Sequence, residues 1–284
     1  MSKAARFREL LTRSSTARFV GARDALTARL VEEAGFDGIW ASSFELSATR
    51  GLPDLGLLTM SECLDAAIHI GEGTSLPLLA DCDTGFGGAI NMARVVRQYE
   101  AAGVGGVCVE DKVLPKRNSY LDGDQELEDA DVFAHRIEAA IRNRSDKDFC
   151  VIARCEALIA GRGMDEAMRR AHRYVDAGAD GILIHSKRRD PSEVIEFLRR
   201  WRSRAPVVAV PTTYNRWGIT DAQELGVSMV IYANQTLRAS VHAIRNVLSE
   251  IQLRGEASTA EDSIAPVKEI FDLTRTAEWE ERGA

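Results

Sequence analysis

Three carboxylates at the ends of two apolar runs are the sharpest chemical feature of the sequence. Asp81 and Asp83 follow the run PLLA, and Glu110 follows GVCV. Side chains alternate along a strand, so Asp81 and Asp83 share a face, and a parallel neighbouring strand would bring Glu110 to the same height. Clustered carboxylates without histidine or cysteine favour Mg2+, or Mn2+, over a softer metal. The alternative is that these carboxylates cap a helix or pair with lysine and arginine.

Two further polar residues interrupt apolar runs. Arg154 lies within VIARCEA, and His185 ends GILIH. A buried arginine needs an anionic partner, either a substrate carboxylate or phosphate or a structural pair such as Glu156. His185 either donates to an anion or is satisfied within the core. Together with the carboxylates, these residues predict a small, multiply charged substrate carrying both carboxylate and phosphate groups.

The elements that must position these residues alternate between strand and helix. Gly-containing helix ends are followed by short β-branched runs, which indicate strands buried on both faces. Eight apolar runs predict strands, within 17–22, 32–42, 77–85, 99–111, 149–157, 175–186, 206–212 and 224–234. Helices are predicted at 24–35, 60–72, 89–102, 128–144, 164–177, 191–203, 220–225 and 236–254. Eight alternations favour an α/β fold, a (β/α)8 TIM barrel. The alternative, a doubly wound open sheet, is weakened because the first strand is not followed by G-x-G-x-x-G.

Two long segments exceed what a minimal barrel needs. Residues 43–59 follow the second strand, and residues 112–127 follow the fourth; the latter is polar and long enough to act as a lid. We therefore predict a catalytic barrel over 1–254 and a helical C-terminal tail over 255–284. Apolar residues of this tail need a surface to cover, on the barrel or on a neighbouring subunit.

Composition narrows the class of protein further. The 284 residues carry 36 Lys and Arg against 43 Asp and Glu, a net charge of −7 that argues against nucleic-acid or anionic-membrane partners. No apolar run approaches the ~18 residues that cross a bilayer, and the first residues lack the apolar core of a secretory signal. Five cysteines without C-x-x-C predict reduced, buried thiols. These features predict a cytoplasmic protein.

Seven stretches along the chain carry a family resemblance. They are GIWASSFELSA, LLADCDTGFGG, VEDKVLPKRNS, VIARCEALIAG, GADGILIHSK, VPTTY and APVKEIF. In this order they resemble the phosphoenolpyruvate mutase branch of the isocitrate lyase superfamily. The most specific piece is Glu110-Asp111-Lys112 followed after five residues by Asn118-Ser119. The lyases of the superfamily resemble this lid but carry a catalytic cysteine, where this sequence has Asn118.

The resemblance implies a role for each matching residue. It implies that Asp81 is the Mg2+ ligand, with Asp83 and Glu110 as its outer partners. The implied catalytic residues are Asp54, Lys116, Asn118, Arg154 and His185, with Lys116 anchoring the closed lid. The implied substrate contacts are Trp40, Ser42, Ser43, Asn118, Ser119 and Arg154, in which Trp40 is an apolar wall and the serines bind the oxyanion and carboxylate.

The activity implied by the resemblance is the interconversion of phosphoenolpyruvate and phosphonopyruvate in phosphonate biosynthesis. Phosphonopyruvate hydrolysis to pyruvate and phosphate is the alternative, because Phe44-Glu45-Leu46 and Phe86 resemble the hydrolases. A 2-oxo or 2-hydroxy dicarboxylate lyase, motivated by GLPDLG at 51–56, and a non-enzymatic binding protein are further alternatives. The resemblance also implies a homodimer or homotetramer with an exchanged C-terminal helix, and a phosphonopyruvate decarboxylase that consumes the product.

Overall fold

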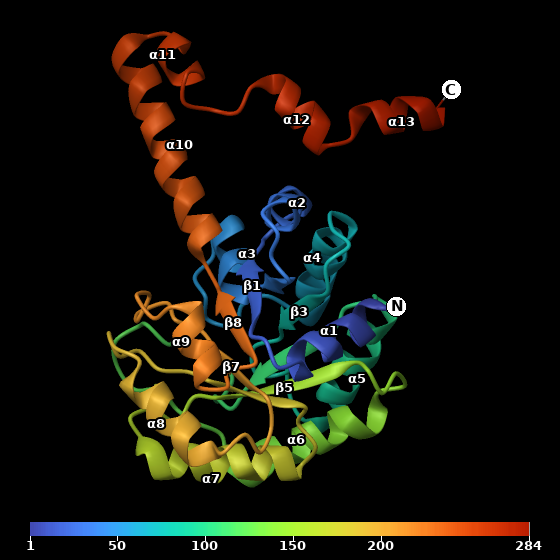
Figure 1. The fold of residues 1–284 in the computed structure, drawn as a ribbon, viewed down its shortest axis with the longest axis vertical. Helices are drawn as coiled ribbons and strands as arrows, with labels where there is room; N and C mark the ends of the chain where they lie inside the picture. The colour runs from blue at the N-terminus through green and yellow to red at the C-terminus, as the bar shows by residue number, and fades with distance from the viewer. Residues whose placement is uncertain (284) are drawn as a thin grey trace. The chain divides into compact units, whose positions relative to one another are not determined.

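Eight parallel strands close into a barrel in the computed structural model, which describes residues 1–283. Each strand pairs with its neighbours in sequence, and β1 pairs with β8 to complete the ring (Figure 1). The strands are β1 Ala17–Gly21, β2 Gly38–Ala41, β3 Leu78–Asp81, β4 Gly106–Glu110, β5 Cys150–Cys155, β6 Gly181–Ile184, β7 Val207–Ala209 and β8 Met229–Tyr232. The predicted (β/α)8 barrel is confirmed, and the closed ring rules out the open sheet.

Helices follow the strands as the alternation predicts. They are α2 Ala25–Glu33, α4 Met60–Glu72, α5 Ala89–Ala101, α6 Ala130–Asn143, α7 Gly163–Asp176, α8 Ser192–Trp201 and α9 Ile219–Glu224. Four of the glycines between helix and strand adopt positive φ, namely Gly35, Gly103, Gly178 and Gly226. This left-handed conformation ends a helix, so each glycine turns the chain directly into the next strand.

Two helices occur where the sequence pattern predicts none. Helix α1, Lys3–Thr12, precedes the first strand, and its Phe7 packs edge-to-face on Phe19 with ring centroids 5.6 Å apart. Phe7 joins the interior apolar cluster, so α1 extends the barrel core. Helix α3, Ser43–Thr49, lies within the segment after β2 and is capped by Ser42. Helix α3 has only seven residues, about two turns, which leaves little periodicity to recognise.

The barrel interior is lined by apolar side chains along the strands and by polar side chains at the strands' carboxyl ends. Four adjacent strands carry an interior apolar residue and a polar residue two positions later: Leu79 and Asp81, Cys108 and Glu110, Ile152 and Arg154, and Leu183 and His185. Because side chains two positions apart share a face of a strand, the polar residues lie directly above the apolar plug. The fold therefore brings these polar side chains together at one end of the packed barrel interior.

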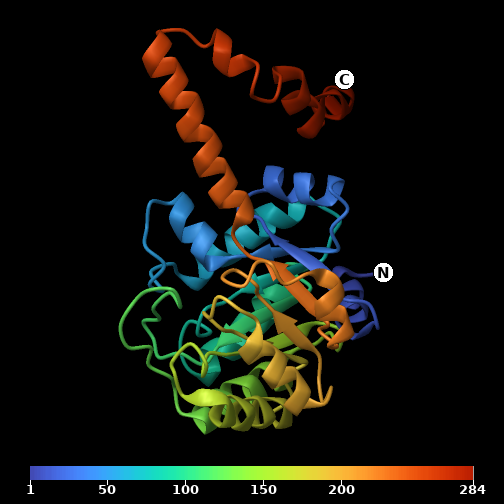
Figure 2. The same ribbon diagram turned by 60° about the vertical axis from the view of Figure 1, so that its left-hand side comes forward.

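The segment 112–127 between β4 and α6 forms an irregular loop whose ends lie together. Lys112 and Leu127 form an antiparallel bridge, and Val113 N donates to Glu126 O at 3.2 Å. The green loop in Figure 2 shows this segment beside the barrel. We call residues 112–127 the lid.

The chain divides into two compact units, of which the first is Met1–Asn234 and the second begins at Gln235. The second unit contains α10 Gln235–Arg254, α11 Ser258–Glu261, α12 Val267–Leu273 and α13 Thr276–Gly283. We expected the barrel to end at residue 254, which is the last residue of α10. The compact units instead separate between Asn234 and Gln235, so α10 belongs to the second unit. Helix exchange between subunits stays a prediction. Among residues 1–283, no helix combines the length and apolar character needed to cross a membrane.

Candidate active site

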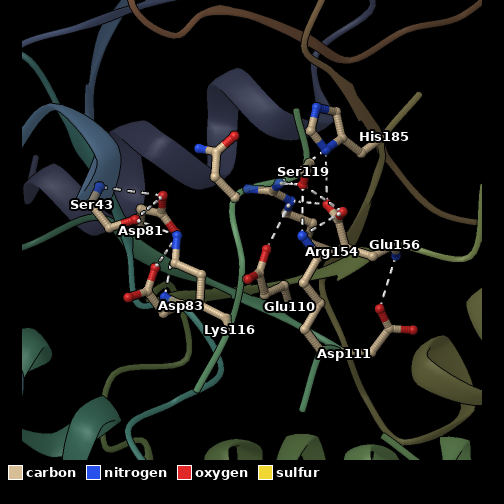
Figure 3. A network of polar contacts seen from close by, with 12 residues as sticks. Ser43, Asp81, Asp83, Glu110, Asp111, Lys116, Ser119, Arg154, Glu156 and His185 are labelled. Carbon is tan, nitrogen blue, oxygen red and sulfur yellow. Dashed lines mark hydrogen bonds and ion pairs between the residues drawn. The ribbon is translucent and has the colours of Figure 1, made fainter. Parts of the chain in front are cut away.

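Ser43 and Asp81 meet at the ends of β2 and β3. Ser43 Oγ donates to Asp81 Oδ2 at 2.9 Å, and Ser43 N donates to the same oxygen at 3.3 Å (Figure 3). Ser43 is the first residue of α3, so its backbone N–H belongs to the group of helix-end donors that lack an intrahelical acceptor. This arrangement holds the Asp81 carboxylate in one orientation.

Lys116 reaches from the lid into the same group of residues. Its Nζ lies 2.5 Å from Asp54 Oδ1, 3.0 Å from Asp83 Oδ1 and 3.5 Å from Ser43 Oγ. Burial lowers the pKa of Lys116, but the charges of Asp83, Glu110 and Asp54 outweigh burial and raise it above its ordinary value. Lys116 is therefore charged and joins the lid to Asp54 and Asp83. We call Ser43, Asp54, Asp81, Asp83 and Lys116 the lysine cluster.

The lysine cluster carries an excess of negative charge. It holds three carboxylates against one ammonium group, and burial, followed by the nearby Asp83, raises the pKa of Asp81. A divalent cation would neutralise this excess, and carboxylate oxygens suit Mg2+. No three histidine, cysteine or acidic side chains within residues 1–283 are arranged to hold a metal by themselves.

Of the three carboxylates predicted around the metal, Asp83 and Glu110 are paired with cations. Asp83 pairs with Lys116, and Glu110 Oε2 lies 3.4 Å from Arg154 Nε. Pairing with lysine and arginine was the alternative for these carboxylates, and it is present. Helix capping by Asp83 is wrong, because α5 begins at Ala89 with Gly88 as its N-cap.

Glu110 is nevertheless only partly compensated. Its Oε1 is buried and accepts no hydrogen bond from any residue in 1–283. Burial raises the pKa of Glu110 to about 7, and the nearby charge of Arg154 opposes this increase. An unsatisfied buried carboxylate oxygen fits a site that binds a cation or its water ligands.

A second group of residues surrounds Arg154, and we call Lys112, Ser119, Arg154, Glu156 and His185 the arginine cluster. Arg154 forms an ion pair with Glu156, and its Nη2 donates to Ser119 Oγ at 3.0 Å. Ser119 Oγ in turn donates to Glu156 Oε2 at 2.8 Å, while Lys112 Nζ lies 3.3 Å from that oxygen. Although burial raises the pKa of Glu156, Arg154 and Lys112 hold it well below its ordinary value.

Both ring nitrogens of His185 have protein partners. Nδ1 lies 2.8 Å from Glu156 Oε1 and 2.9 Å from Arg154 Nη2, and Nε2 lies 3.1 Å from the Tyr120 hydroxyl. Burial lowers the pKa of His185, and the charge of Glu156 opposes this decrease. Both nitrogens of His185 are therefore satisfied within the protein, and the anion that its Nδ1 faces is Glu156.

Asn118 connects the lid to the lysine cluster. Its Nδ2 donates to Asp54 Oδ2 at 2.6 Å, and its Oδ1 accepts from Tyr120 N at 3.0 Å. These two bonds fix the orientation of the amide, with the NH2 group directed to the carboxylate. The lid thus contributes Lys116 to the lysine cluster and Ser119 to the arginine cluster (Figure 3), while Asn118 bonds Asp54 of the lysine cluster.

Trp40 and Ser42 lie at the carboxyl end of β2. Trp40 is buried in the interior apolar cluster, which agrees with an apolar wall, although its contact with a substrate stays a prediction. Ser42 Oγ accepts from Glu45 N at 3.4 Å and thereby caps α3. Of the two predicted serine contacts, Ser43 therefore points its hydroxyl into the lysine cluster and Ser42 supports the helix that carries it.

Sequence reasoning missed a polar network behind the arginine cluster. Buried Asp111 accepts from Tyr174 OH at 2.5 Å, from Glu156 N at 2.8 Å and from Arg170 Nη1 at 3.0 Å. Arg170 also donates to Glu128 O at 2.9 Å, directly after the lid. The sequence does contain a signal for this network. Arg170 and Tyr174 lie one turn apart on the buried face of α7, beside Ala167 and Ala171, so both side chains need buried polar partners.

Fold and site together define a class of protein. A closed (β/α)8 barrel with buried charges at the carboxyl ends of its strands, covered by a polar lid, is the architecture of barrel enzymes. The two clusters gather cationic and carboxylate side chains at this end of the barrel.

Comparison with known proteins identifies the family. Residues 7–252 match the model for phosphoenolpyruvate phosphomutase. A phosphonopyruvate hydrolase from Variovorax sp. (strain Pal2) is 46% identical over 256 residues, which are 89% of this chain and 88% of the relative. A crystal structure of a phosphoenolpyruvate phosphomutase from Streptomyces platensis subsp. rosaceus is 47% identical with a TM-score of 0.96, over 98% of this chain and 97% of that one. A phosphonopyruvate hydrolase solved in complex with oxalate and Mg2+ is 42% identical with a TM-score of 0.93, over 99% and 98%.

The chain therefore belongs to the phosphoenolpyruvate phosphomutase family, a family of enzymes. The family resemblance is confirmed. Mutases and hydrolases both occur among its close relatives.

Proposed function

We propose that the protein is a phosphoenolpyruvate mutase, which interconverts phosphoenolpyruvate and phosphonopyruvate by moving a phosphoryl group between the enol oxygen and carbon. The carrying observation is the position of Asn118, whose NH2 group points from the closed lid into the lysine cluster. An amide there offers a fixed neutral donor to a phosphoryl oxygen and cannot act as a base toward water.

We assign different residues to the two ends of the substrate, the pyruvyl group and the phosphoryl group. We assign the pyruvyl end to Ser43, Asp81 and Lys116 of the lysine cluster, where Ser43 orients Asp81 and the buried Lys116 adds positive charge. The phosphoryl end is assigned to Asn118, on the Asp54 side of that cluster, together with Arg154. Asp81 would hold Mg2+, with Asp83 and Glu110 binding its water ligands, and the metal would supply Lewis-acid stabilisation of the enolate oxygen. Arg154, held by Glu156 and Ser119, neutralises the transferring phosphoryl group. Because both nitrogens of His185 are occupied, we assign it the positioning of Arg154.

A closed lid favours the mutase reaction over hydrolysis. In the mutase reaction the phosphoryl group must be transferred to carbon before water can react with it. Lys116, with 5% of its surface exposed, and Ser119, with 2%, are both lid residues that lie inside the site. A closed lid excludes bulk water from a reactive, metaphosphate-like species.

Phosphonopyruvate hydrolysis is the second candidate, favoured by the 46% identity to the Variovorax hydrolase. Incubation with Mg2+ and phosphonopyruvate, followed by phosphorus NMR, separates the two activities. A mutase converts the C–P resonance into that of phosphoenolpyruvate. Release of inorganic phosphate and pyruvate as the main products would establish the hydrolase instead.

The wider setting follows from this activity. We propose a cytoplasmic homodimer or homotetramer that exchanges its C-terminal helices, in keeping with the exposed apolar residues of α10 and α12, which include Ile244, Leu248, Val267 and Phe271. The C–P product lies uphill of phosphoenolpyruvate, so a phosphonopyruvate decarboxylase is the expected consumer in phosphonate biosynthesis.

A further inference from the structure

Tyr120 is the lid residue in contact with His185. Its hydroxyl lies 3.1 Å from His185 Nε2, and the two rings meet edge-to-face at 88° with centroids 5.7 Å apart. Burial raises the pKa of this hydroxyl, which keeps its proton at neutral pH. Tyr120 thus joins the lid to His185, the residue that directly follows β6.

The backbone of Tyr120 is coupled to the lysine cluster. Tyr120 N donates to Asn118 Oδ1 at 3.0 Å, and this bond directs Asn118 Nδ2 to Asp54. One residue therefore contacts His185 through its side chain and orients Asn118 through its backbone. A displacement of Tyr120 would disturb both contacts.

Tyr120 also stands at the boundary between solvent and the buried site. It is 39% exposed, whereas His185 is 3% exposed and Ser119, its neighbour in the chain, is 2% exposed. Tyr120 is therefore partly exposed while its hydroxyl contacts the buried His185 of the arginine cluster.

We propose that Tyr120 is a specificity-determining residue that latches the lid and sets how much of the phosphoryl group is lost to water. The proposal rests on the proposed function and deepens it. In the rearrangement the C–P bond of phosphonopyruvate breaks and an O–P bond forms to the enolate oxygen. In the competing hydrolysis the O–P bond forms to a water oxygen, water supplies the proton taken by the enolate carbon, and pyruvate and phosphate leave.

The first measurement compares products from Tyr120→Phe, the wild type and Tyr232→Phe by phosphorus NMR. Tyr232 packs edge-to-face on Phe36, away from the lid, and provides a matched loss of a hydroxyl. We expect Tyr120→Phe to raise the ratio of phosphate to phosphoenolpyruvate about fivefold, the effect of losing one hydrogen bond. An unchanged ratio, or a wild type that releases phosphate alone, would overturn the proposal.

The second measurement needs no turnover. Arg117 is an exposed lid residue followed by Asn118, so trypsin cleavage after Arg117 reports opening of the lid. We expect several-fold faster cleavage of intact Tyr120→Phe protein than of the wild type or Tyr232→Phe. Equal rates would show that Tyr120 does not latch the lid. If phosphonopyruvate is not consumed at all, the proposed function and the product ratio fail together, whereas cleavage still decides whether the latch exists.

Discussion

Asn118 Nδ2 donates to Asp54 Oδ2 at 2.6 Å, and this bond joins the lid to the loop that follows α3. Asp54 Oδ1 also lies 2.5 Å from Lys116 Nζ, so one carboxylate holds two lid residues. Because Asp54 is 8% exposed, these contacts are largely shielded from water. Asp54 is consequently the point at which lid closure and the orientation of the Asn118 donor depend on each other.

Asn118→Ala removes the amide donor without disturbing the barrel. We expect kcat to fall about 10²- to 10³-fold, the effect of losing one oriented donor to a developing charge. Thermal unfolding and Mg2+ binding should stay close to those of the wild type. Asn246→Ala, which alters an exposed amide of α10, is the matched control. Turnover within twofold of the wild type would remove Asn118 from the reaction.

Arg170→Met tests the network behind the arginine cluster. The variant leaves the buried Asp111 carboxylate without its ion-pair partner, 3.0 Å away, and we expect a loss of about 3 kcal/mol in the free energy of unfolding. Arg169→Met is the control on the same helix, because Arg169 also pairs with Glu166 but its side chain is 57% exposed. Its expected loss is below about 0.5 kcal/mol. Urea denaturation of both variants measures the difference, and equal losses would contradict a special role for Arg170.

Much of the fold could be predicted because it depends on local patterns. The turn from helix to strand at Gly103 and Gly178 follows from glycine chemistry, and the positions of Asp81 and Glu110 follow from alternation along strands. These features need only neighbouring residues in the chain.

The contacts within the site could not be predicted because they join distant segments. Nothing near Asp54 in the sequence indicates that Lys116 and Asn118 will reach it, since the path of an irregular lid is set by its tertiary contacts. For the same reason the sequence does not predict the contacts of Tyr120 and Arg170. Their partners, His185 and Asp111, lie 65 and 59 residues away in the chain.

A pH series tests the buried environment of His185. Burial lowers its pKa below the ordinary value of 6.5, so the folded protein binds this proton less tightly than the unfolded chain does. The free energy of unfolding therefore loses a contribution as pH falls through 6.5 to the folded pKa, and this loss is complete below that pKa. The groups facing the ring are Glu156, Arg154 and Tyr120.

His185→Asn lacks this titration, which isolates the effect. We expect the unfolding free energy of the wild type minus that of His185→Asn to decrease between pH 7.5 and pH 5. Glu110 acts in the opposite direction, because its pKa is raised to about 7, but it is present in both proteins and cancels in the difference. The stabilisation from Glu156 is lost only below its ordinary pKa of 4.5. A difference that is constant with pH would contradict the buried, neutral histidine.

Mg2+ binding tests the charge balance of the lysine cluster. Three carboxylates face one ammonium group, so a divalent cation relieves repulsion in the folded protein and stabilises it. At free Mg2+ about a hundred times the dissociation constant, a cation bound only by the folded state adds about 2.7 kcal/mol to the free energy of unfolding. We expect this gain in the wild type and in Asp65→Asn, which changes an exposed carboxylate of α4. Asp81→Asn removes the oriented carboxylate and should abolish most of the gain, as measured by thermal unfolding in MgCl2. Equal gains in Asp81→Asn and Asp65→Asn would place the cation elsewhere on the protein, because a site centred on Asp81 cannot keep its affinity once that carboxylate has become an amide.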